Sequence, residues 1–230
     1  MSVNDLVLVQ GIRDTRRTLA SWQRDPLAVV GVWLGWSFLI ALALLASVYL
    51  IAANSGPEYS RLAIPGLHHE ADVKDVLHIL YRNGLVLALH AMACVAGFIA
   101  GSAMPLSAKN RSGISRWVHE KAGPLAIAFV VGATAFSLVT QAYVLGGGAA
   151  TLSWQLDVGP GVLLAVVAVH ALPELVALFL PLAAWIVASR QGDWHELLAA
   201  TFVTVAIAVP VLVVSALVEV HVTPQLLARL

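Results

Sequence analysis

The sequence predicts an all-α, polytopic membrane protein with about five transmembrane helices, and three observations indicate this fold class. Of the 230 residues, 60% are hydrophobic and only 11% are charged, and the mean hydropathy is +0.86. Soluble domains carry about 25% charged residues, so this chain cannot cover a water-exposed surface in the usual way. Five apolar stretches are long enough to cross roughly 30 Å of hydrocarbon at about 1.5 Å per residue. The charged residues fall mainly between these stretches.

Composition also narrows the possible functions. The net charge is zero, which argues against nucleic acid as a partner. Cys94 is the only cysteine, so an intramolecular disulfide and a multi-cysteine metal site are excluded, and we expect it to be a small buried residue. The sequence contains no nucleophile elbow and no phosphate-binding glycine loop, and we predict no cofactor.

Residues 1–26 are predicted to form a cytoplasmic amphipathic helix. Within residues 4–22, the side chains Leu8, Ile12, Thr15, Leu19 and Trp22 recur at spacings of four and three, and the arginines lie elsewhere on the helical wheel. This pattern favours binding to anionic lipid at the inner membrane face, with docking to a partner protein as the alternative. The apolar run that follows is too long for a cleavable signal, so we expect it to remain as a span.

The predicted spans lie near residues 27–53, 84–104, 124–146, 161–189 and 198–222, within one transmembrane domain of residues 27–230. Residues 54–82 form the largest predicted extracytoplasmic loop. It contains Pro57, Pro65 and Gly66 and then a helical stretch from Ala71. A segment of this length can cap the helices but is too short for a domain of its own.

The basic residues predict the orientation of the chain in the cell (inner) membrane. Nine of the 13 lysines and arginines fall on the amino-terminal side of the membrane and four on the other side. Lysine and arginine are retained in the cytoplasm, so we expect the amino terminus inside. An odd number of spans then places the carboxyl terminus outside.

Seven polar or ionisable residues lie within the spans or at their outer ends. They are Asn83, His90, Gln141, His170, Glu174, Glu219 and His221. A charged side chain in hydrocarbon costs about 2.5–3.5 kcal/mol on insertion scales, so such residues usually face protein or water. With the predicted orientation all seven fall in the extracytoplasmic half, which predicts a polar cluster or a shallow, outward-opening cavity.

Three further residues bear on helix geometry and packing. Gly97 and Gly101 form a close-packing pattern of the Gly-x-x-x-Gly type in the second span. Pro173, which lies between His170 and Glu174, has no amide hydrogen to donate to the carbonyl of Val169, so this carbonyl is expected to add to the polar patch. An ordinary kink whose backbone groups are satisfied by neighbouring helices is the alternative.

The pair His170 and Glu174 admits three interpretations. Residues four apart share a helix face, so the pair can lock helices in register, handle protons or a substrate, or bind a metal together with His90 or Glu219. The zinc-protease helix motif, which has two histidines flanking an acidic residue, is absent. Whether a metal is bound stays open at this point.

The fourth and fifth spans resemble the stage II sporulation protein M family. Residues 170–175 (His-Ala-Leu-Pro-Glu-Leu) are similar to the family's His-Gly-x-x-Glu-Leu segment, and residues 216–224 (Ala-Leu-Val-Glu-Val-His-Val-Thr-Pro) resemble its terminal helix, which closes in Ile-Glu-x-x-x-Thr-Pro. Asn83 followed by two helix glycines is also similar. The likeness covers roughly residues 75–104 and 135–224. This chain departs from the pattern at Ala171, at Gln141 and in an insertion near residues 107–121.

The resemblance implies an integral membrane scaffold or assembly subunit of a cell-envelope complex, because the sporulation members of the family act as the membrane scaffold of such a complex. The expected partners are membrane lipid, other membrane or cell-envelope proteins and a second copy of the chain. A role in sporulation itself is not implied. The alternative function is a transporter or an intramembrane metal-dependent hydrolase that uses His170 and Glu174.

Overall fold

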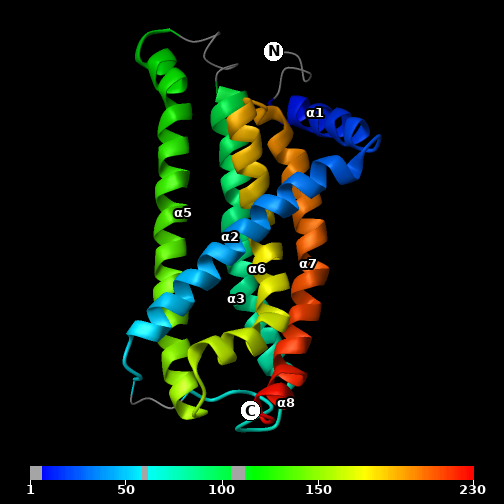
Figure 1. Ribbon diagram of the computed structural model, residues 1–230. Helices are drawn as coiled ribbons and strands as arrows, with labels where there is room; N and C mark the ends of the chain where they lie inside the picture. Colours follow the sequence, from blue (N-terminus) through cyan, green and yellow to red (C-terminus); the bar gives the residue numbers. More distant parts are fainter. Residues whose placement is uncertain (1–6, 59–61, 105–111) are drawn as a thin grey trace. The chain divides into compact units, whose positions relative to one another are not determined.

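The computed structural model describes residues 7–58, 62–104 and 112–230, and these residues form helices joined by turns and loops (Figure 1). Apart from one isolated bridge between Pro65 and His69, no strand pairing occurs in this part of the chain, which confirms the all-α prediction. In chain order the elements are α1 (Val7–Trp22), α2 (Pro26–Asn54), α3 (Val73–Phe98), the π-helical turn η2 (Ile99–Ala103), α5 (Gly113–Gln155), α6 (Pro160–Gln191), the 3-10 turn η3 (Trp194–Glu196), α7 (Leu197–His221) and α8 (Thr223–Leu227).

Five helical segments among the described residues are long and apolar enough to cross a membrane, as the sequence predicted. They are Pro26–Asn54, Val73–Ser102, Ile127–Gln155, Pro160–Gln191 and Trp194–Leu227. This is the architecture of a multi-pass membrane protein. The amphipathic segment expected in residues 1–26 forms α1 from Val7 onward, and residues 1–6 lie outside the described residues.

Two helices are longer than the predicted spans. α3 begins at Val73, so the helical stretch expected near Ala71 continues directly into the second span without a break at residue 84. α5 runs on to Gln155, nine residues beyond the predicted end at Gly146. A Cβ atom at Gly146 would overlap the side chain of Ile51. Glycine therefore permits a close approach of α2, and this packing offsets the cost of about 1 kcal/mol that glycine carries in a helix.

The chain divides into two compact units. Unit 1 comprises Met1–Ser37, Leu87–Thr134 and Phe179–Ile207, and unit 2 comprises Phe38–Val86, Ala135–Leu178 and Ala208–Leu230. Each of the five long helices contributes one segment to each unit.

Unit 1 is held together by aromatic and small side chains. Its buried core includes Trp33, Leu180, Ala183, Ala184 and Ala200. The two glycines that the sequence predicted to serve packing lie here as well. A Cβ atom at Gly97 would lie 2.7 Å from Leu197 and 2.8 Å from the indole nitrogen of Trp185, and one at Gly101 would overlap Trp194. Both glycines therefore permit a large side chain to approach the α3 and η2 backbone.

Unit 2 contains the connection before α3 and the carboxyl-terminal segment. Gly66 has a φ of +78°, a left-handed conformation that favours glycine, and its amide donates a hydrogen bond to the carbonyl of His69 at 2.9 Å. A Cβ atom at Gly66 would lie 2.8 Å from the carbonyl oxygen of Val220 and 2.9 Å from Pro224. The loop therefore packs directly on the end of α7 and on α8.

Candidate functional site

Unit 2 contains a cavity of about 360 Å³ with a polar lining. Four helices contribute to it: α3, α5, α6 and α7. The polar and charged side chains that line it are Arg82, Asn83, Thr140, Gln141, Glu174 and Glu219, and the remaining wall is aliphatic. Four of the seven residues in the predicted cluster, Asn83, Gln141, Glu174 and Glu219, therefore lie around one hollow.

The charges in this cavity lie close to one another. Glu219 is near enough to Glu174 and to Arg82 for its carboxylate to interact electrostatically with both side chains. If all three groups are ionised, two negative charges face one positive charge. The cavity therefore favours a proton or a cationic group that balances the second carboxylate.

Two polar atoms of this lining are buried without a hydrogen-bond partner among the described residues. They are Nδ2 of Asn83 and Oε2 of Glu174. The amide of Asn83 interacts with the carboxylate of Glu174, but the geometry of these two atoms falls short of a hydrogen bond. Because most buried polar atoms are hydrogen-bonded, the site suits a molecule that donates to Glu174 and accepts from Asn83.

Gln141 is oriented from within its own helix. Its Nε2 donates a hydrogen bond to the hydroxyl of Ser137 at 2.9 Å, one turn earlier on α5. The side-chain oxygen of Gln141 is not used in this bond. The amide oxygen of Gln141 is thus a hydrogen-bond acceptor in the cavity wall, whereas the side-chain nitrogen of Asn83 is a donor.

His170 does not line the cavity but forms a separate contact nearby on α6. Its Nδ1 lies 2.7 Å from Oγ1 of Thr223, the first residue of α8, and both side chains are buried. A hydroxyl can donate or accept, so this bond forms with either tautomer of the ring. The contact joins α6 to the carboxyl-terminal segment.

The other predicted site residues lie elsewhere. His90 belongs to unit 1, where its buried ring packs edge-on against Phe179 with a centroid separation of 5.5 Å. His221 is exposed at the end of α7. Pro173 is exposed in unit 2 and shares a shallow hollow with Pro210. α6 stays helical through Pro173, from Pro160 to Gln191, and the Val169 carbonyl as an addition to the polar patch stays a prediction.

Within residues 7–58, 62–104 and 112–230, no three side chains of His, Cys, Asp or Glu come together in an arrangement that could hold a metal ion. The pairing of His170 with His90 or Glu219 as metal ligands is therefore not observed there. Glu174 and Glu219 remain a pair of carboxylates next to a guanidinium.

Three residues of this region were missed as site residues. Arg82 was assigned to the extracytoplasmic loop because α3 was expected to begin only at residue 84, yet it directly precedes Asn83 on the helix. Thr140 likewise precedes Gln141. Thr223 was noted only for its likeness to a family motif, although a threonine before a proline after an apolar helix is a recognisable helix start. No family model, curated protein or solved structure matches this chain.

Proposed function

We propose that this chain is an integral membrane scaffold or assembly subunit of a cell-envelope complex, and a divergent member of the stage II sporulation protein M family. One observation carries the proposal. The two segments on which the resemblance depends, residues 170–175 and 216–224, both belong to unit 2 and approach each other at two positions. His170 contacts Thr223, and Glu174 interacts with Glu219.

Contacts of this kind suit a protein whose task is to hold helices in a fixed arrangement. Lipid is as apolar as the helix surfaces, so helices in a membrane associate through close packing and polar contacts rather than through hydrophobic burial. The His170–Thr223 bond fixes α8 against α6, and α8 in turn packs on the loop at Gly66. The polar side chains thereby order the surface at this end of unit 2, where we place the contact with partner proteins.

The proposal includes an orientation in the cell membrane with the amino terminus in the cytoplasm. The described basic residues of unit 1 outnumber those of unit 2, and lysine and arginine near span ends are retained inside. Unit 1 contains Arg13, Arg16, Arg17, Arg24, Arg116, Lys121 and Arg190, whereas unit 2 contains Lys74, Arg82 and Arg229. Unit 2, with the polar cavity, would then face the cell exterior.

The test compares His170→Ala with His221→Ala. Both variants remove a histidine from unit 2, but only His170 is buried and hydrogen-bonded. We expect His170→Ala to lower the midpoint of thermal unfolding in detergent and to reduce the recovery of partners after cross-linking in cells. His221→Ala should behave like wild type. Equal stability and equal partner recovery in the two variants would contradict the scaffold proposal.

A second function, the binding or transport of a small polar molecule, is favoured by the cavity itself. The unpaired atoms of Asn83 and Glu174 and the excess of carboxylates suit a small cation with hydrogen-bonding groups. Glu174→Gln separates the two functions because it keeps the shape of the side chain and removes its charge. A scaffold should retain its stability and its partners in this variant. A transporter should lose uptake of small organic cations into proteoliposomes, whereas Thr140→Val serves as a control at the same wall.

A further inference from the structure

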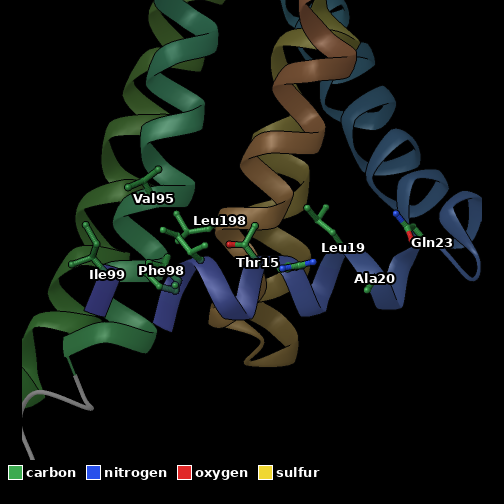
Figure 2. A pocket seen from close by; sticks show the side chains of 11 residues that line it. Thr15, Leu19, Ala20, Gln23, Val95, Phe98, Ile99 and Leu198 are labelled. Carbon is green, nitrogen blue, oxygen red and sulfur yellow. The ribbon is translucent and has the colours of Figure 1, made fainter. Parts of the chain in front are cut away.

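Unit 1 contains a second hollow, which is larger than the cavity in unit 2 and has a mainly apolar lining. It has a volume of about 780 Å³ and lies between α1 and the segments of α3, η2 and α7 (Figure 2). This volume is within the roughly 300–1,000 Å³ range of small-molecule sites. The wall is mainly aliphatic and aromatic, with Val95, Phe98, Ile99 and Leu198 facing α1.

α1 contacts the rest of unit 1 at both ends of this groove. At Gly11 a Cβ atom would lie 3.2 Å from both Phe98 and Leu198, so the helix backbone approaches these side chains closely. At the other end, Trp22 packs edge-on against Trp33 with a centroid separation of 5.1 Å. Between these contacts Thr15 and Leu19 point from α1 toward the groove (Figure 2). The groove is therefore held open by contacts at both ends.

The lining of α1 combines apolar and cationic side chains. Ile12 is 70% exposed although it belongs to the groove wall, and Arg16 lies one turn further along the same wall. Arg17 forms an ion pair with Asp14 at 3.9 Å, but Arg16 has no ion pair within the described part of the chain. Thr15 and Gln23 add hydrogen-bonding groups. A free guanidinium beside an apolar hollow complements a molecule with an acyl chain and a phosphate.

We propose that this groove binds an anionic phospholipid, with one acyl chain between α1 and the α3 and α7 segments and the phosphate on Arg16. The aliphatic and aromatic wall suits an acyl chain, and the Arg16 guanidinium in the same lining suits the phosphate. The lipid would fill the space between the two attachment points and fix α1 on unit 1.

Native mass spectrometry of the full-length protein tests this proposal. Protein exchanged into detergent with equal amounts of phosphatidylglycerol and phosphatidylcholine should retain phosphatidylglycerol preferentially. Arg16→Gln should lower this retention about five-fold, the effect of one basic residue near an anionic lipid. Arg24→Gln removes the same charge outside the groove and should retain the lipid as wild type does. Ala20→Trp, which adds bulk to the groove wall, should exclude both lipids.

Thermal unfolding in phosphatidylcholine alone checks that the variants are folded, and their midpoints should match wild type. Two results would overturn the proposal. Equal retention of the two lipids by wild type would show that the groove does not recognise charge. An equal loss for Arg16→Gln and Arg24→Gln would show general attraction to a basic surface instead of a defined site.

Discussion

The two units differ in the contacts that hold their helices together. In unit 1 the helices approach through glycines that meet large rings, at Gly97 with Trp185 and at Gly101 with Trp194. In unit 2 a glycine also meets a large side chain, at Gly146 with Ile51, and a buried hydrogen bond between His170 and Thr223 joins α6 to α8. Both devices work in lipid, where apolar surface alone gives helices no reason to associate. Unit 2 also gathers ionisable groups, because Arg82, Glu174 and Glu219 line one cavity.

The largest expected effect is a difference in accessibility between one residue of each unit, which tests the orientation that we propose from the basic residues. We expect a cysteine introduced at Glu70, on the exposed loop of unit 2, to react with an impermeant maleimide on intact cells. A cysteine introduced at Arg24, in unit 1, should react only after permeabilisation. Cys94→Ala provides the background, since Cys94 is the only native thiol. The reverse pattern would refute the orientation that the basic residues predict.

The next effect tests close packing in unit 1. Gly101→Leu should lower the free energy of unfolding by about 3 kcal/mol, because the new side chain overlaps the ring of Trp194. Gly132→Leu is the matched control, since no atom lies within 4 Å of a Cβ added there. It should be neutral or slightly stabilising, because leucine favours helix over glycine. Unfolding in detergent, followed by circular dichroism, measures both, and equal values would mean that glycine packing does not hold unit 1 together.

A smaller effect is expected from the polar contact in unit 2. Thr223→Val keeps the shape of the side chain and removes the partner of His170, leaving a buried ring nitrogen unpaired. The cost should be about 1–3 kcal/mol, the usual range for an unsatisfied buried polar group. Thr140→Val, at the cavity wall but outside that hydrogen bond, should change the unfolding midpoint less. If Thr223→Val were instead stabilising, the bond would not contribute to holding α8.

The fold was predictable because lipid imposes a simple rule on composition. Runs of apolar residues of sufficient length predict spans, and all five were found in this way. The boundaries were harder to predict because polar residues do not end a helix by themselves. α3 begins at Val73, before Arg82 and Asn83, and α5 continues through Gly146, where the absence of a side chain permits contact with Ile51.

The candidate site was predictable in part, and the reason lies in helix geometry. Spacing along one helix shows which residues share a face, but it does not show which faces of different helices meet, as those of Glu174 and Glu219 do at the cavity. His90 lies on the same helix as Asn83, yet it packs against Phe179 in unit 1. The contact of His170 with Thr223 depends on how the chain turns after His221, which no periodicity within α7 encodes.

The smallest expected effect concerns a surface ion pair. It tests whether the stability of unit 1 depends on buried contacts and not on charges at its surface. Arg17 and Asp14 form an ion pair at 3.9 Å on α1, with the arginine side chain 83% exposed. Exposed pairs of this kind contribute about 0.5 kcal/mol or less, since solvent screens the charges. Arg17→Gln should therefore leave the unfolding midpoint of the protein nearly unchanged at physiological salt. A shift as large as that of Thr223→Val would show that the charge pair on α1 stabilises unit 1. Glycine packing would then not be sufficient to explain the stability of unit 1.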